Sequence, residues 1–204
     1  MTSPLIFYLL ALVVPVFVGK TGSAPFWLAV QALALGAHSL AHSEALSLHA
    51  LVSLFEVVVL RATLAPLLLR RAIASRGEPE ADLLPSNLFT WGIATALIVL
   101  AFQFGAPALS DRQSLALGAV GATVAVALLL LSTNEAPAAQ LVAVLFMENA
   151  IALFESLLAE PWPLPVHGAL GAIYLLTAFV GSSLIGDPDS AGLDIDASAE
   201  GEAP

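Results

Sequence analysis

Apolar residues fill the chain in long stretches, and short polar segments containing proline and glycine separate them. The hydrocarbon core of a bilayer is about 30 Å thick, and an α-helix of about 20 residues crosses it. The stretches are apolar on all sides, which favours helices over the alternating strands of a membrane barrel. The pattern predicts seven transmembrane helices, at residues 4–19, 25–41, 45–69, 88–106, 114–132, 138–159 and 166–186.

The composition agrees with this pattern. Hydrophobic residues make up 59% of the chain and charged residues only 11%. So few polar side chains cannot cover such an apolar mass in water, which excludes an ordinary soluble domain. The absence of cysteine excludes disulfides and thiolate metal sites. We therefore expect an all-α, polytopic membrane helix bundle at residues 1–186, located as a multi-pass protein in the cell membrane.

The net charge of −10 is concentrated at the carboxyl end. The segment 187–204 has low hydrophobicity and acidic but no basic residues, so we expect a disordered tail. Nucleic-acid binding requires a basic face, and the sequence does not offer one. The acidic residues of the tail are Asp187, Asp189, Asp194, Asp196, Glu200 and Glu202.

Lysine and arginine residues predict the orientation of the bundle. With seven spans, the basic residues of one side are Lys20, Arg70, Arg71 and Arg76, whereas the other side has Arg112. Short loops rich in these residues stay in the cytoplasm. The amino terminus is therefore predicted outside and the acidic tail in the cytoplasm.

One acidic residue, Glu148, lies at the middle of the predicted span 138–159. A charged side chain at this depth costs about 2.5–3.5 kcal/mol on insertion scales, so such residues usually face a partner or water and mark a pathway. Hydrocarbon surroundings disfavour the charged carboxylate, which lets a proton bind and leave near neutral pH. Glu148 is our main candidate for a proton relay. The alternative is a protonated side chain that hydrogen-bonds a neighbouring helix, which is also the expected role of Asn149.

Glu56 and Arg61 form a second candidate in the span 45–69. On an α-helix, side chains five residues apart are separated by about 140°, so these two are expected to face different neighbours. A cation next to a carboxylate stabilises its charge, and movement of that cation would let the carboxylate take up a proton. Alternatively, Arg61 extends its side chain to the cytoplasmic interface.

Two further residues extend this polar set. Glu155 lies two turns beyond Glu148 and projects from nearly the same face, unless its side chain simply reaches the membrane interface. His49 lies two turns before Glu56 and could pass protons to it.

The remaining histidines do not predict a metal site. His38 and His42 have the four-residue spacing of a helical metal pair, but a chain turn near residues 43–44 separates them from a third ligand. His167 begins the last span and is expected at the membrane interface.

Two stretches resemble a known family. FMENAIALF around Glu148, and EVVVLRATLAPLLLRRAI from Glu56 onward, are similar to the hydrogenase-4 component E family of membrane subunits, over roughly residues 45–186. The resemblance implies a place in the membrane arm of an assembly related to respiratory complex I, such as formate hydrogenlyase. It also implies that the last three spans are similar to the K subunit of complex I, with Glu148 at the place of its buried glutamate. Arg61 stands where relatives often have lysine, and Gly171 where they often have a second acid.

The resemblance implies a non-catalytic subunit that binds no cofactor or metal and contacts antiporter-like and other membrane subunits. Its candidate proton pathway consists of Glu148, Glu56, Arg61, His49 and Glu155. The alternative is a small free-standing transporter with its own cavity. The sequence lacks the paired repeats and broken helices typical of many transporters.

Overall fold

The computed structural model describes residues 3–42, 48–76, 81–105, 111–158, 160 and 162–186. Regular structure in these residues is helical, apart from an isolated antiparallel bridge between Lys20 and Asp82. This confirms the all-α prediction. The predicted disordered tail, residues 187–204, lies outside the described residues.

The predicted third span, 45–69, corresponds to a continuous rod of three helical segments, in which α3, the π-helix η2 and α4 follow one another without a break. The rod continues to Arg76, so Arg70, Arg71 and Arg76 lie in a helix and not in the loop that the sequence predicted. Each of the other predicted spans coincides with one α-helix. The bounds are α1 Ser3–Val18, α2 Ala24–His42, α3 Leu48–Phe55, η2 Glu56–Leu64, α4 Ala65–Arg76, α5 Leu88–Gly105, α6 Asp111–Thr133, α7 Pro137–Glu155 and α8 Leu164–Gly186, with the short 3-10 helix η1 at Thr21–Ser23.

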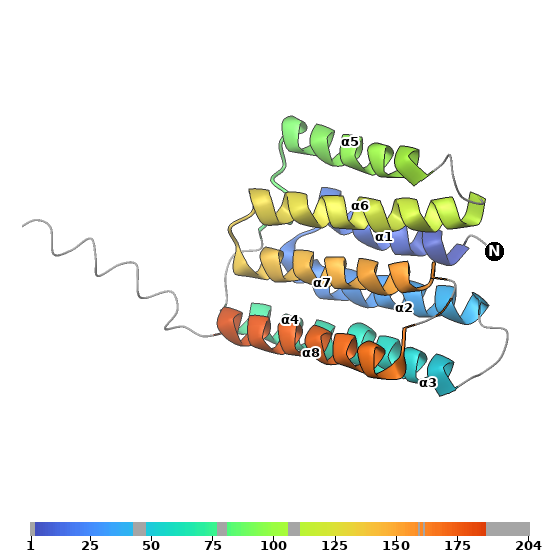
Figure 1. Ribbon diagram of the computed structural model, residues 1–204. Coiled ribbons are helices and arrows are strands. Elements are labelled where there is room, and N and C mark those ends of the chain that lie inside the picture. Colours follow the sequence, from blue (N-terminus) through green and yellow to red (C-terminus); the bar gives the residue numbers. More distant parts are fainter. Residues whose placement is uncertain are drawn as a thin grey trace, which may run out of the picture.

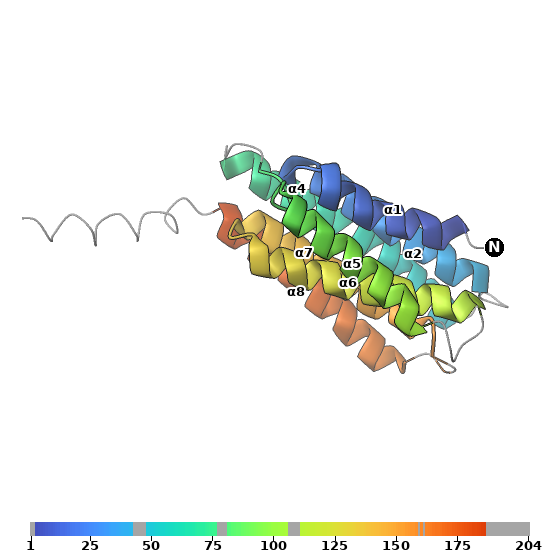
Figure 2. The ribbon, with the colours of Figure 1, turned by 90° about the horizontal axis from the view of Figure 1, so that it is seen from above.

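The helices lie side by side, with successive passes running in opposite directions (Figures 1 and 2). α5 forms one edge and packs on α6, and α6 packs on α7. Behind α6 and α7, α1 pairs with α2, while the rod packs on both α2 and α8. This arrangement surrounds η2 with α2 and α8 and brings α7 close to it, so polar residues of four segments can meet inside the bundle.

Five helical segments of the described residues are long and apolar enough to cross a membrane. Two shorter apolar helices, Pro4–Val18 and Leu88–Phe104, coincide with the remaining predicted spans. Large apolar side chains cover much of the outer surface, as expected where hydrocarbon is the solvent. The five segments are Thr21–Ala41, Ala50–Arg76, Gln113–Thr133, Pro137–Glu155 and Leu164–Gly186.

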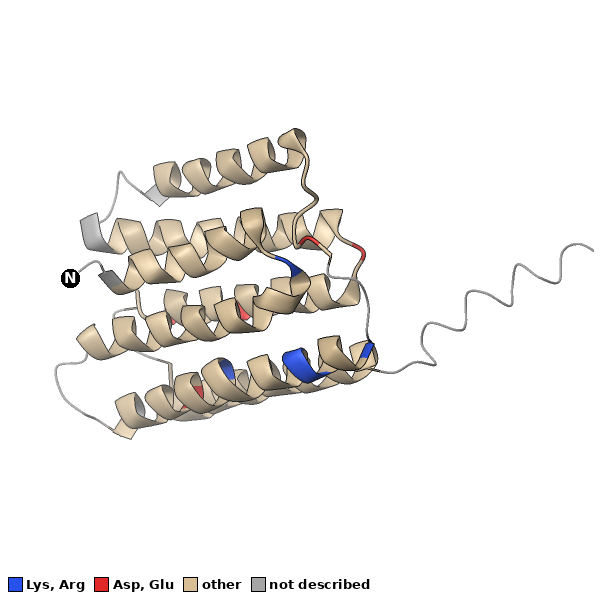
Figure 3. Cartoon of the chain, turned by 180° about the vertical axis from the view of Figure 1, so that it is seen from behind, with Lys and Arg blue, Asp and Glu red and all other residues tan. Residues whose placement is uncertain are grey.

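Most basic residues lie at one end of the bundle, which we call the basic end, where α4 and α8 finish (Figure 3). Arg76 ends α4, Arg70 and Arg71 lie near the middle of this helix, and Lys20 is held next to Asp82 by the bridge. The side chain of Arg112 lies outside the described residues. At the opposite end α7 finishes and α8 begins, and the charged residues inside the bundle lie between this end and its middle.

Candidate functional site

The π-helix η2 sets the position of the two central charged residues. Its backbone bonds join residues five apart, as in the bond from the Ala65 amide to the Leu60 carbonyl. The Thr63 hydroxyl likewise donates to the Val58 carbonyl, five residues earlier, at 2.8 Å. Several local features favour this wide turn. Residues 57–59 are β-branched valines that crowd a regular helix, and Pro66 would press on the carbonyl four residues before it.

Because residues five apart lie above one another in a π-helix, Glu56 and Arg61 face each other. Arg61 Nε donates to Glu56 Oε1 at 2.8 Å, and Arg61 Nη2 lies 2.8 Å from the same oxygen. The prediction that the two side chains face different neighbours is therefore wrong. It assumed the turn of an α-helix, whereas η2 turns more slowly.

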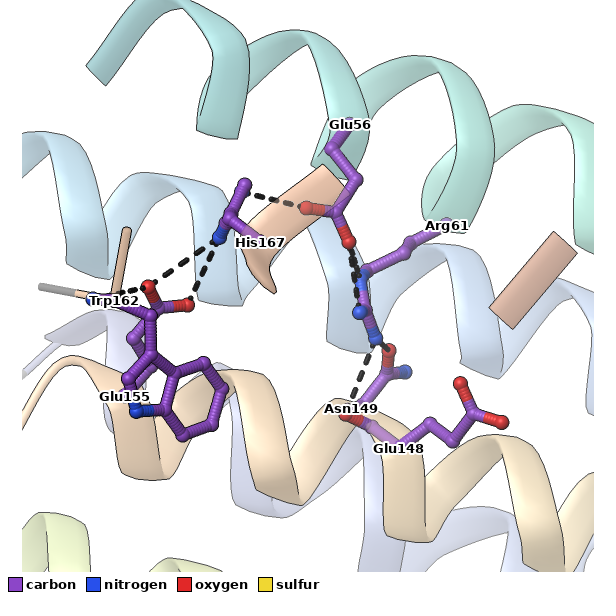
Figure 4. A network of polar contacts seen from close by, with 7 residues as sticks. All are labelled: Glu56, Arg61, Glu148, Asn149, Glu155, Trp162 and His167. Atoms are coloured by element: carbon purple, nitrogen blue, oxygen red, sulfur yellow. Dashed lines mark hydrogen bonds and ion pairs between the residues drawn. The ribbon is translucent and has the colours of Figure 1, made fainter. Parts of the chain in front are cut away.

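Arg61 is buried and holds three segments together. Its Nη1 donates to the backbone carbonyl of Glu148 at 3.1 Å and to Asn149 Oδ1 at 3.2 Å (Figure 4). Its guanidinium carbon lies 4.3 Å from the centre of the Tyr174 ring, a cation–π contact with α8. Only 3% of Arg61 is exposed, which overturns the alternative that it extends to the interface.

Asn149 and Gln31 continue these contacts to α2. Asn149 is fully buried, and its Nδ2 donates to Gln31 Oε1 at 2.9 Å. This confirms the expectation that Asn149 hydrogen-bonds a neighbouring helix. Gln31 lies in an otherwise apolar stretch, and nothing in its local sequence pairs it with a residue more than a hundred positions away.

His167 connects two carboxylates. Its Nε2 lies 2.7 Å from Glu56 Oε2, and its Nδ1 lies 3.1 Å from Glu155 Oε2 (Figure 4). His167 lies in the first turn of α8, as the sequence predicts, but its side chain faces the interior of the bundle, because only 6% of the residue is exposed. It begins α8 by sequence, but the preceding loop places this first turn against η2.

Glu155 is the outermost carboxylate of the set. Besides His167 it accepts a hydrogen bond from the Trp162 amide at 3.3 Å, and 11% of its side chain is exposed. This amide and His167 hold its carboxylate inward, so it does not simply reach the interface. When His167 is protonated, it and Arg61 supply two positive charges against the two carboxylates of Glu56 and Glu155. The four side chains then form a neutral set, which we call the buried charge chain.

The Glu148 carboxyl group lies outside this chain. Figure 4 shows that it points away from Arg61, and it lies beside the Thr177 hydroxyl of α8. Glu148 is half-buried, and its hydrogen bond to the buried charge chain is made by its backbone carbonyl. The residues that the sequence singled out are thus divided: Glu56, Arg61 and Glu155 come together, and Glu148 is adjacent.

The side chain of His49 lies outside the described residues, as does that of His42. His38 is buried near the opposite end of the bundle, in α2. Among the described residues, no group of three or more His, Asp and Glu side chains is arranged to hold a metal ion.

The buried charge chain occupies one half of the bundle. It begins with Glu155, at the end of the bundle opposite the basic end. It finishes near the middle of the bundle with Arg61, Asn149 and Gln31. Toward the basic end the described core is mainly apolar, and its residues include Leu28, Leu69, Leu141, Val142, Leu145 and Ile185. Protons can be relayed along the first half, whereas the second half offers few polar groups.

Gly171 of α8 leaves the space that the Glu56 side chain occupies. A methyl group at this position would lie 3.1 Å from both Cγ and Cδ of Glu56. We expect Gly171→Ala to destabilise the bundle by about 1–3 kcal/mol, because a closely packed site must shift to accept the added carbon. Unfolding of the detergent-solubilised protein, followed by circular dichroism, measures this.

The same helix offers a matched control. Gly168 lies one turn away, and a methyl group there would meet nothing within 4 Å. Gly168→Ala should therefore leave stability unchanged or raise it slightly through helix propensity. Equal effects of the two substitutions would show that Glu56 is not tightly packed against α8.

Comparisons with protein families, with curated proteins and with solved structures find no match for this chain.

Proposed function

We propose that this chain is a non-catalytic membrane subunit of a complex I-like energy-converting hydrogenase or related redox complex. In this role the buried charge chain passes protons into the middle of the bundle. The observation that carries the proposal is His167, whose two ring nitrogens each face a different carboxylate. Burying charged groups is costly, and in membrane proteins such groups mark ion and proton pathways.

An imidazole between two carboxylates can act as a proton relay. When His167 is neutral with its proton on Nε2 and Glu155 is protonated, the Glu155 proton binds at Nδ1 and the Nε2 proton leaves for the Glu56 carboxylate, so that charge crosses the ring without movement of the helices. Nδ1 is hydrogen-bonded to Glu155 Oε2 at 3.1 Å, and Nε2 lies at ion-pair distance, 2.7 Å, from Glu56 Oε2. Arg61 stabilises the charged form of Glu56 and therefore favours return of the carboxylate after each transfer.

Two further residues of the sequence prediction belong to the proposed pathway. The backbone carbonyl of Glu148 accepts a hydrogen bond from Arg61 at the inner end of the buried charge chain. A change of the Glu148 rotamer would bring its carboxyl group closer to Arg61. His49 follows Leu48 at the start of α3, seven residues before Glu56 along the same rod. We propose Glu148 as the next acceptor and His49 as an additional entry.

The buried charge chain reaches only one end of the bundle, which favours a subunit over a free-standing transporter. A transporter needs a path to both membrane surfaces, whereas the described polar path runs from the opposite end to the middle only. A subunit can complete the path with groups of a neighbouring protein. Within this proposal the partners are antiporter-like and other membrane subunits, and the protein resides in the cell membrane.

We propose seven membrane crossings with the amino terminus outside, which places the start of the buried charge chain at the outer surface. The chain has no cysteine, so single cysteines can be introduced at Ser75 and Ser110. A membrane-impermeant maleimide added to intact cells should label the cysteine at 110 and not the one at 75. Labelling at 75 alone would reverse the orientation.

Purification tests the subunit proposal directly. Affinity purification in a mild detergent should yield the chain together with a large antiporter-like subunit and a nickel–iron hydrogenase subunit, identified by mass spectrometry. A monodisperse, stable monomer without such subunits would instead support the transporter. If the complex forms but Glu148→Gln and the charge-chain variants leave its proton coupling intact, the chain has a purely structural role.

A further inference from the structure

Among the described residues, Glu148 is a half-exposed ionisable side chain near the middle of the bundle that lies outside the buried charge chain. Glu148 is half-buried, lies in the central part of α7, and directs its carboxyl group away from Arg61 (Figure 4). The Thr177 hydroxyl beside it can satisfy one lone pair. The rest of the carboxyl group would face hydrocarbon in an isolated chain, which is a costly arrangement.

The surroundings of this carboxyl group are apolar and exposed. Ile151, one turn further along α7, is 42% exposed, and Ile173, one turn before Thr177 on α8, is 52% exposed. Val180 of α8 is also exposed. We call the surface formed by Val144, Glu148, Ile151, Ile173, Thr177 and Val180 the α7–α8 face. It combines exposed apolar side chains with one acidic group among them, which suits the docking of a membrane helix that offers a cation.

We propose that a transmembrane helix of a different polypeptide docks on the α7–α8 face and places a lysine or arginine against Glu148. Opposite charges that meet at this depth neutralise each other, so the partner's cation removes the cost of exposing the carboxylate to lipid. The inference rests on the proposed function in one respect only, that the chain is part of a membrane assembly.

Among the described side chains, no lysine or arginine contacts the Glu148 carboxyl group, and Arg61 contacts this residue only at its backbone carbonyl. The basic residues of the chain are six in number. Four of them, Lys20, Arg70, Arg71 and Arg76, lie at the basic end, and Arg112 lies near the start of α6. Arg61 is the basic residue at mid-depth, and it is buried against Glu56. In a symmetric pair of chains the same surface contacts itself, so Glu148 would approach a second Glu148. Charge complementarity therefore selects a different polypeptide.

A spin label attached to a single cysteine at Ile151 tests this proposal, because the chain has no native cysteine. Accessibility to dissolved oxygen is compared between native-membrane nanodiscs and purified protein in lipid-only nanodiscs. We expect the label at 151 to be several-fold less accessible in the native particles. A label at Phe179 is the matched control, since this exposed residue of α8 lies about 200° around the helix from Thr177. It should be equally accessible in both particles.

The charge of Glu148 is tested in the same native particles. Glu148→Lys should restore oxygen accessibility at 151, because it sets two cations against each other. Glu148→Leu, which suits a lipid environment and is not expected to impair folding, should restore it as well. An unchanged signal at 179 in both variants shows that the bundle is folded.

Three results would overturn the proposal. Equal accessibility of the label at 151 in native and lipid-only nanodiscs would mean that lipid covers the face. Protection in purified particles that contain two chains would assign it to a second copy. If the label at 151 stays protected in both Glu148→Lys and Glu148→Leu, then the partner docks without a charge pair to Glu148. Because this experiment measures docking and not proton transfer, its failure leaves the relay to be judged by Glu56 variants.

Discussion

Arg61→Met is expected to destabilise the folded bundle by about 3–5 kcal/mol, the usual cost of removing one partner of a buried ion pair. The substitution leaves the Glu56 carboxylate without the guanidinium that lies 2.8 Å away. It also removes the hydrogen bonds to the Glu148 carbonyl and Asn149 and the contact with the Tyr174 ring. Reversible unfolding of the solubilised protein in SDS, followed by circular dichroism, measures the free energy.

Two variants separate charge from shape in this experiment. Arg61→Lys keeps the charge but cannot contact Glu56, Asn149 and the Glu148 carbonyl together, so it should lose part of the stability. The double variant Glu56→Gln/Arg61→Met removes both charges and should recover at least half of the loss, which a double-mutant cycle quantifies. If Arg61→Met lowers the free energy of unfolding by less than about 1 kcal/mol, the ion pair between Glu56 and Arg61 is accessible to water, like a surface ion pair.

The helices were predictable from the sequence because their apolar stretches are long and their connections contain proline and glycine. The boundaries of α5, α6 and α8 lie within a few residues of the predicted spans 88–106, 114–132 and 166–186. Such stretches indicate helices through length and composition alone. Neither property depends on which helix packs on which.

The candidate site was predictable only in part, because its geometry depends on two features that a helical wheel does not contain. The first is η2, which brings Glu56 and Arg61 together although an α-helix would separate them. The sequence signal that accompanies it is a run of valines followed by Pro66, with an acid and a base five apart. The second is the placement of α8 against η2, which buries His167 between Glu56 and Glu155.

Glu148 shows the limit of arguing from depth alone. Its position in the middle of α7 was correctly read from the sequence, but depth does not specify direction around the helix axis. The structure turns the backbone carbonyl toward Arg61 and the carboxyl group away from it. The residue that most stood out in the sequence is therefore adjacent to the buried charge chain, and a residue assigned to the interface, His167, connects its two carboxylates.

Glu56→Gln is expected to reduce proton transfer through the assembly by about 100-fold, at the lower end of the range for removing a positioned acid–base group. Glutamine preserves the size of the side chain and can still accept a hydrogen bond from Arg61 or His167. It cannot bind and release a proton. His167 would then lose the acceptor that lies 2.7 Å from its Nε2, and the relay would stop halfway.

Inverted membrane vesicles supplied with hydrogen or formate measure this effect through the fluorescence quenching of a pH-sensitive acridine dye. The rate of electron transfer to an artificial acceptor is followed in parallel, and it should persist, because Glu56 lies far from any redox chemistry in this proposal. The matched control is Glu160→Gln. This variant alters an exposed acidic residue near the outer end of the buried charge chain. This variant should retain the acidification rate of the unmodified protein.

The comparison between the two glutamates decides what the buried charge chain does. If Glu56→Gln and Glu160→Gln acidify the vesicles equally fast, then protons do not pass through His167, and the ion pair with Arg61 serves only to hold η2 against α7 and α8. If Glu56→Gln alone stops acidification while circular dichroism shows a folded bundle, a structural role cannot explain the loss. The geometry favours the second result, because a purely structural pair needs one cation and one carboxylate, whereas this site adds a histidine and a second carboxylate that continue toward the surface.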